Sequence, residues 1–155
     1  MVKHEAHDTG GSDMGIIQIS VFVENQPGRV NRLTDILEKA DVSIRGFSLA
    51  DTADFGIARF VLDKPEVALE AFREADVLTK TTELLCIELP DRPGSLGHVF
   101  AAVAAAGINV EYAYSLVSSF VVLKVGDIQQ AEQLLGEQPV RLVAPDELRQ
   151  PLAKG

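Results

Sequence analysis

The sequence predicts an α+β fold in which one βαββαβ unit occurs twice. Residues 25–30 (NQPGRV) match residues 91–96 (DRPGSL) at an offset of 66, and residues 40–44 (ADVSI) match 106–110 (AGINV) at the same offset. Further along, Ala68 matches Ala131 and Val77 matches Val140 at an offset of 63. The second copy is therefore three residues shorter than the first, and the missing residues correspond to positions between 47 and 62 of the first copy. We assign this deletion to a hairpin loop, where a change of length is tolerated.

Within each copy, hydrophobic periodicity alternates between the strand and helix patterns. In the first copy, alternating residues predict strands at 17–24, 42–49, 55–62 and 77–82, and helical stripes follow Gly28 and Pro65. A phase shift at Gly46 predicts a β-bulge, and 51–54 (DTAD) is typical of a turn. The second copy predicts strands at 84–89, 108–116, 120–125 and 140–143, with helices at 96–106 and 128–135; Asp127 is placed to cap the latter.

This element order is the ferredoxin-like plan, an antiparallel sheet with both helices on one face. Because few residues separate the copies, we expect them to pack side by side, either as two sheets or as one longer sheet. We assign residues 1–15 to a flexible N-terminal tail, 16–82 to the first unit, 83–147 to the second and 148–155 to a C-terminal tail.

Composition excludes several classes of protein. The 155 residues carry 14 Lys and Arg against 23 Asp and Glu, a net charge of −9 that disfavours binding to nucleic acid. The single cysteine, Cys86, allows no intrachain disulfide, which fits the cytoplasm. The longest apolar stretch, 99–108, is too short to span a bilayer, and the N-terminus lacks the apolar region of a signal peptide.

The sequence offers no constellation for catalysis. His4 and His7 lie in the expected tail, where nothing would hold a metal, and His98 lies off the apolar stripe of its helix. Neither a nucleophile with a base partner nor a pair of carboxylates at catalytic spacing is evident. We therefore expect a protein that is not an enzyme and that uses no cofactor or metal.

The Asn/Asp-x-Pro-Gly loop before each first helix is the distinctive motif. Proline fixes φ, and glycine lets the backbone approach a bound group. The helix N-terminus that follows can accept a carboxylate, while Asn25 or Asp91 can accept hydrogen bonds from an ammonium group. The loop therefore suits a zwitterionic amino acid. The alternative is that the motif is only a turn and a helix start.

The doubled motif, the strand entry A-x-I/V-x-I/V, residues 48–59 (SLADTADFGIAR) and residues 89–94 (LPDRPG) resemble ACT domains, the small-molecule regulatory modules of amino-acid metabolism. Two of them in one chain look like a stand-alone bacterial tandem ACT protein. The resemblance implies amino-acid binding at interfaces between ACT units, where the first loop of one unit faces the second strand of its neighbour. The implied ligand-binding residues are Asn25, Gln26, Pro27, Gly28, Arg29, Val30, Asp91, Arg92, Pro93, Gly94, Ser95, Leu96 and Asn109.

The two copies differ at these positions. Ser43 replaces Asn109 in the first copy, and Asp91 can pair an ammonium by charge whereas Asn25 can only hydrogen-bond, so we expect the stronger site at Asp91. The hairpin at 116–119 (LVSS) is shorter than in the stand-alone bacterial tandem ACT proteins that the sequence resembles. Two functions remain open: an amino-acid sensor with allosteric output, or a ligand-free oligomerisation module docking to a metabolic enzyme. We expect a homodimer, because a lone sheet leaves strand edges that a second copy can cover. We expect no binding to nucleic acid or to a membrane.

Overall fold

The computed structural model describes residues 13–51 and 55–151. His4 and His7, most of the expected N-terminal tail, the turn at 52–54 and residues 152–155 lie outside the described residues. The chain divides into two compact units. Here the first unit means Ile17–Thr82 together with the segment from Asp146, and the second means Glu83–Pro145 together with Ile16 and the residues just before it.

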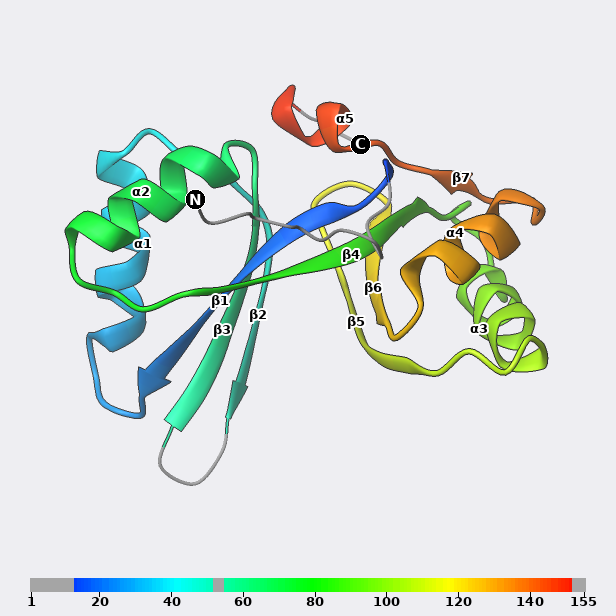
Figure 1. Ribbon diagram of the computed structural model, residues 1–155, viewed down its shortest axis with the longest axis horizontal. Helices are drawn as coiled ribbons and strands as arrows, with labels where there is room; N and C mark the ends of the chain where they lie inside the picture. Colours follow the sequence, from blue (N-terminus) through cyan, green and yellow to red (C-terminus); the bar gives the residue numbers. More distant parts are fainter. Residues whose placement is uncertain (1–12, 52–54, 152–155) are drawn as a thin grey trace, which may run out of the picture. The chain divides into compact units, whose positions relative to one another are not determined.

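The first unit has the predicted order, with strands drawn as arrows and helices as coils in Figure 1. Strands β1 and β2 both pair with β3 in antiparallel register, so β3 lies between them. Register shifts between Ile44 and Gly46, which confirms the predicted bulge. The elements are β1 (Ile16–Glu24), α1 (Arg29–Lys39), β2 (Ile44–Asp51), β3 (Phe55–Leu62) and α2 (Pro65–Glu74), and the start of β4 completes the unit.

The second unit repeats this arrangement. Strand β4 pairs antiparallel with β6 and with the short β7, and β5 pairs antiparallel with β6. A register shift between Val110 and Tyr112 lies 66 residues after the first bulge. The elements are β4 (Lys80–Glu88), α3 (Ser95–Ala105), β5 (Val110–Ser115), β6 (Phe120–Val125), α4 (Ile128–Gly136) and β7 (Arg141–Leu142). The predicted α+β fold of two βαββαβ units is confirmed.

One predicted boundary between two strands is absent. The strands expected at 77–82 and 84–89 are a single strand, β4, that runs from Lys80 to Glu88. No glycine or proline occurs between 77 and 89, and Thr and apolar residues there favour extended backbone, so nothing interrupts the strand. The last three residues of the first βαββαβ unit and the first strand of the second are therefore one continuous element.

Each unit has its own apolar core between the sheet and its two helices. In the first, Leu33 and Leu37 of α1 and Phe72 of α2 pack against Ile19 and Phe60 of the sheet. In the second, the core comprises Leu85, Ile87, Val99, Val103, Ile108, Val121, Leu123, Val125, Ile128, Ala131 and Leu135. The apolar helix faces predicted from the sequence periodicity are thus the faces that are buried in the structure.

The ends of the helices also repeat. Helices α1 and α3 both end in a left-handed residue, Asp41 (φ 60°) and Gly107 (φ 74°). The next residue then donates a backbone hydrogen bond of 3.0 Å to the carbonyl five residues earlier, from Val42 to Leu37 and from Ile108 to Val103. This is the Schellman pattern, which satisfies carbonyls that the helix end leaves free. In α4, Asp127 Oδ1 accepts from the Gln130 amide at 3.1 Å, which confirms the predicted cap.

A short helix near the C-terminus was not predicted. Helix α5 (Pro145–Arg149) includes Leu148 and Arg149, which the sequence pattern assigns to a C-terminal tail. The Leu148 side chain is buried, and the segment from Asp146 groups with the first unit. Proline followed by two acidic residues is a helix-start signal, so the sequence did contain an indication of this element.

Candidate functional site

The two Asn/Asp-x-Pro-Gly loops have the same backbone geometry. Gly28 and Gly94 are the N-caps of α1 and α3, with φ of 85° and 87° and ψ of −9° and −7°. Three backbone hydrogen bonds recur at the 66-residue offset: Gln26 N to Glu24 O, Arg29 N to Gln26 O and Arg32 N to Gly28 O in the first loop, and Arg92 N to Pro90 O, Ser95 N to Arg92 O and His98 N to Gly94 O in the second. The repeat therefore preserves the loop conformation.

The glycines are required by conformation, and the space beside them is open. A Cβ added at Gly28 would have no heavy atom within 4 Å, and one at Gly94 would meet only Nε2 of His98, at 3.9 Å. Positive φ near 85° is readily available to glycine alone. Each loop thus exposes backbone at a helix N-terminus, where the first N–H groups lack partners within the helix.

The structure brings six candidate residues of the second loop together at the surface. Ser95 is half-buried, and the others, Asp91, Arg92, Pro93, Gly94 and Leu96, are exposed. In the first loop, Val30 is half-buried, and the exposed residues are Asn25, Gln26, Pro27, Gly28 and Arg29. Asn109 is exposed between α3 and β5, and Ser43 takes the same place before β2; neither lies with its own unit's loop in the cavities described below.

A groove of about 850 Å³ runs beside the second loop. One wall is the loop itself, including Asp91, Arg92 and Gly94, and the other is the hairpin between β5 and β6. Three serines of that hairpin, Ser115, Ser118 and Ser119, were not predicted as site residues. The shortened hairpin still faces the loop and lines this groove with hydroxyl groups. The missed signal was the cluster of serines at 115–119.

The charges of the two loops are used differently. Arg29 lies 3.4 Å from a carboxylate oxygen of Glu24 and donates a hydrogen bond to Gln26 at 3.3 Å. By contrast, neither the Asp91 carboxylate nor the Arg92 guanidinium has an ion-pair or hydrogen-bonding partner among the described residues. The second loop therefore presents one anionic and one cationic side chain side by side, both available to a zwitterionic ligand.

Metal sites and membrane spans are both absent from the described residues. Nowhere in the part of the chain that the structure describes do three or more His, Cys, Asp or Glu side chains gather where they could hold a metal ion. Over residues 13–51 and 55–151, every helix is too short or too polar to cross a lipid bilayer.

Comparison with known proteins identifies the family to which the chain belongs. The family model described as "ACT domain pair" matches residues 14–150. The chain belongs to the ACT domain pair family. The resemblance drawn from the sequence is thus confirmed, and the matched stretch includes both glycine loops, the groove and α5. The curated proteins give no match.

Solved structures agree with this assignment. Protein BT0572 from Bacteroides thetaiotaomicron is 30% identical, with a TM-score of 0.84 over 89% of this ACT domain pair and 98% of that chain. The regulatory subunit of aspartate kinase from Thermus thermophilus, in a ligand-free form, is 19% identical, with a TM-score of 0.59 over 80% of this chain and 90% of that one. The corresponding subunit from Thermus flavus is 20% identical, with a TM-score of 0.56 and the same two coverages. The Thermus structures share the fold.

Proposed function

We propose that this ACT domain pair is a non-catalytic regulatory protein that binds an amino acid at the loop containing Asp91. The observation that carries the proposal is that Asp91 and Arg92, neither of which has a charged partner among the described residues, lie beside the exposed N-terminus of α3. An ammonium group would pair with the Asp91 carboxylate, and the ligand carboxylate would accept from helix N–H groups or from Arg92. The fold shared with aspartate kinase regulatory subunits supports a regulatory role.

The loop of the first unit is the weaker site in this proposal. Asn25 carries no charge to attract an ammonium, and Arg29 is already paired with Glu24. A neighbouring ACT unit supplied by a second copy of the chain would complete the Asp91 site and bring Asn109 to it. Binding would then favour one assembly over another, which is how a sensor without an active site passes a signal to an enzyme. The lone, reduced Cys86 supports a cytoplasmic location.

A thermal-shift screen against the twenty amino acids, followed by calorimetry, tests the proposal. A ligand at 100 times its Kd raises the free energy of unfolding by about 2.7 kcal/mol. We expect Asp91→Asn to weaken binding by tenfold or more, because it removes the charge and keeps the shape. Asn25→Asp is the matched control: it adds the same charge to the other loop and should leave binding at Asp91 unchanged. No thermal shift and no heat with any amino acid would refute the sensor function.

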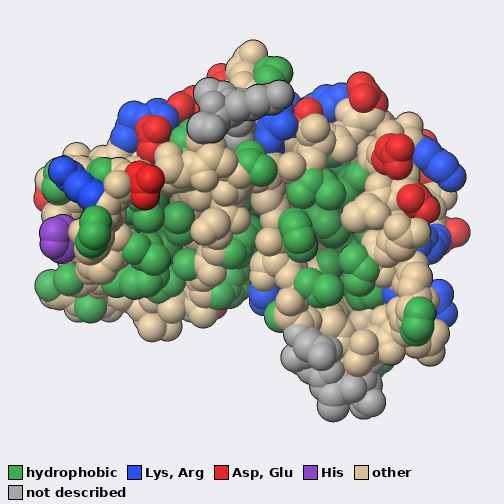
Figure 2. All heavy atoms as spheres, turned by 180° about the vertical axis from the view of Figure 1, so that it is seen from behind, with side chains coloured by type: hydrophobic (Ala, Val, Ile, Leu, Met, Phe, Trp, Pro, Cys, Tyr) green, Lys and Arg blue, Asp and Glu red, His purple; other side chains and the backbone are tan. Residues whose placement is uncertain are grey.

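A ligand-free interaction module is the second candidate, and one observation favours it. Large apolar side chains are unusually exposed in the first unit: Phe22 at 71%, Phe47 at 64%, Leu49 at 53% and Phe55 at 50%. Figure 2 likewise shows apolar side chains at the surface of the protein. Exposed apolar groups on and beside an edge strand are typical of association surfaces.

Light scattering after size-exclusion chromatography tests this second function. A dimer that Phe47→Glu dissociates, with no change on adding any amino acid, would favour the interaction module. A dimer whose stability rises with one amino acid would favour the sensor. If the chain stays monomeric at all concentrations and binds an amino acid, the exposed residues do not mediate self-association.

A further inference from the structure

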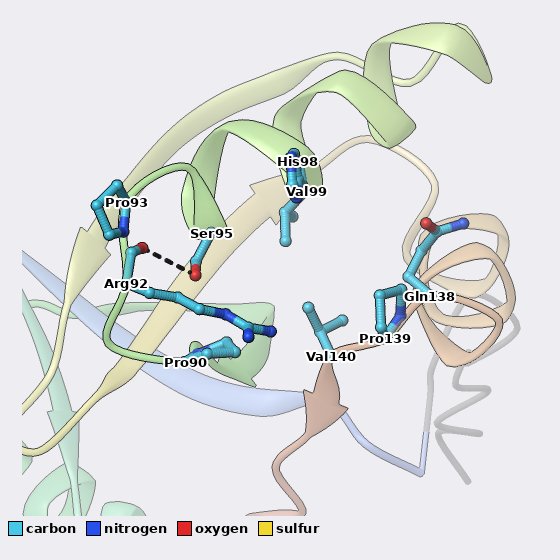
Figure 3. Close-up of a pocket in the computed structure, with 9 residues that line it drawn as sticks. All are labelled: Pro90, Arg92, Pro93, Ser95, His98, Val99, Gln138, Pro139 and Val140. Atoms are coloured by element: carbon cyan, nitrogen blue, oxygen red, sulfur yellow. Dashed lines mark hydrogen bonds between the residues drawn. The ribbon is translucent and has the colours of Figure 1, made fainter.

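A second, smaller cavity adjoins the loop that contains Pro93. It has a volume of about 110 Å³ and lies within the second unit, between the loop, α3 and the residues that join α4 to β7 (Figure 3). Ser95 and His98 of α3 border it on one side, and Gln138 and Pro139 on the other. Pro90, Arg92 and Ser95 line both this cavity and the groove, so the two spaces share one cation.

The polar groups of this cavity are suited to a negative charge. Figure 3 shows the Arg92 side chain extending under Ser95 toward Val140, into the cavity. No described residue pairs with its guanidinium. The Ser95 hydroxyl donates to the Arg92 carbonyl at 3.1 Å, which holds this part of the loop against the first turn of α3.

The remaining walls are apolar, and none of the described lining residues is acidic. Pro90, Pro93, Pro139, Val99 and Val140 form these walls. Asp91, which would receive an ammonium group, lines the groove and not this cavity. A cavity of about 150 Å³ can enclose a six-carbon ring, so about 110 Å³ admits a body of four or five heavy atoms. A short carbon chain ending in one carboxylate fits both the size and the chemistry.

The first unit contains a corresponding cavity in which two acidic side chains balance two cationic ones. That cavity is lined by Glu24, Arg29 and Arg32 at the positions of Pro90, Ser95 and His98, and by Asp76 at the position of Pro139. Arg29 pairs with Glu24 at 3.4 Å, and Arg32 donates to the Ala75 carbonyl at 2.9 Å. Two acids and two occupied cations leave no free positive charge there, so the repeat provides an internal comparison.

We propose that the cavity of the second unit binds a short-chain monocarboxylate that carries no ammonium group, with Arg92 as the cation and one site per chain. This site is separate from the Asp91 groove, and its existence does not depend on the proposed amino-acid function. Because Arg92 lines both spaces, a monocarboxylate in the cavity would compete with the groove for that side chain. A carboxylate metabolite and an amino acid would then oppose each other's binding.

Titration of the intact chain with propionate, followed by NMR and calorimetry, tests this proposal. Propionate has five heavy atoms, and propionamide has the same shape without the charge. Alanine adds an ammonium group to the same carbon chain. We expect propionate to bind with one site per chain, and propionamide and alanine to bind at least tenfold more weakly in this cavity. The resonances of His98 and Gln138 should move and those of Ser118 should not.

Two isosteric variants of α4 and the residues after it provide the decisive comparison. Gln138→Glu places a carboxylate in the cavity, where it should repel the ligand and pair with Arg92, weakening propionate tenfold or more. Gln133→Glu makes the same change on exposed α4 outside the cavity and should have no effect. Equal binding by both variants, equal binding of propionamide, or no binding of propionate at 50 times the protein concentration would overturn the proposal. Asp91→Asn should leave propionate binding intact, which separates this site from the amino-acid site.

Discussion

Arg45 Nε donates a hydrogen bond of 2.8 Å to the backbone carbonyl of Leu148, 103 residues later in the chain. Its Nη2 donates to the Gln150 carbonyl at 3.0 Å, and the Arg149 guanidinium contacts both carboxylate oxygens of Glu66, at 2.8 and 3.2 Å. The Leu148 side chain is 2% exposed. Arg45 is the extra residue of the bulge in β2, and the bulge places its side chain where it can hold the C-terminal segment.

Replacing Arg45 should release this segment. Arg45→Met keeps most of the aliphatic stem and removes two hydrogen bonds together with the 4.0 Å ion pair to Asp63, which should lower the free energy of unfolding by about 1–3 kcal/mol. Urea denaturation and limited proteolysis near residue 145 measure the two effects. Arg92→Met is the control, since no described residue pairs with Arg92. Equal stability of both variants would show that the polar contacts of Arg45 contribute nothing to folding.

The contact between Glu66 and Arg149 should make stability depend on acid pH. The hydrogen bond from Arg149 lowers the pKa of the Glu66 carboxyl below its ordinary value. A carboxyl with a lowered pKa adds stability above its unfolded pKa of about 4.3, and that stability is lost as the pH falls through the lowered folded value. Because both side chains are about half exposed, the effect should stay below about 1 kcal/mol.

Glu66→Gln tests this pH dependence. The variant should be less stable than the native chain at pH 7, and the difference should shrink as the pH falls from 5 to 3. Glu38→Gln, at an exposed position of α1, is the matched control and should show no such trend. A difference between Glu66→Gln and the native chain that stays constant with pH would mean that the carboxylate charge is not involved.

Two glycines three residues apart should respond in opposite directions to alanine. Gly94 has φ of 87°, so Gly94→Ala forces a left-handed alanine and should cost about 1–2 kcal/mol. Gly97 lies inside α3, where an added Cβ meets nothing within 4 Å, so Gly97→Ala should stabilise the chain by up to about 1 kcal/mol. Thermal denaturation measures both. Stabilisation by Gly94→Ala would show that the loop tolerates a different conformation.

The internal repeat indicates a stabilising substitution. Asp41 has φ of 60° at the end of α1, where the second unit has Gly107 at the equivalent place. Asp41→Gly should relieve left-handed strain and raise the free energy of unfolding by about 0.5–1 kcal/mol, while Gly107→Asp should lower it by a similar amount. The Lys64–Asp41 ion pair of 3.5 Å offsets little, because the Asp41 side chain is fully exposed. Denaturation midpoints that move the same way in both variants would contradict this prediction.

Local signals in the sequence were sufficient for the βαββαβ order within each repeat, the bulge at Gly46 and the cap at Asp127, because each depends on residues close together in the chain. The single strand β4 was predicted as two, since the repeat suggested a boundary where the chain has no turn residue. The serines of the β5–β6 hairpin were missed because their proximity to the Asp91 loop depends on strand pairing across the sheet.

The sequence by itself determined that this ACT domain pair has two related units and that a Pro-Gly turn precedes the first helix of each. A repeat and the positions of proline and glycine can be read directly from the sequence, and local steric effects then restrict the backbone at those positions. Only the tertiary structure decided that Asp91 and Arg92 lack partners among the described residues while Arg29 has one, and that Arg45 holds the C-terminal segment. Whether a charge is free or paired depends on side chains that folding brings together, which one loop sequence does not specify.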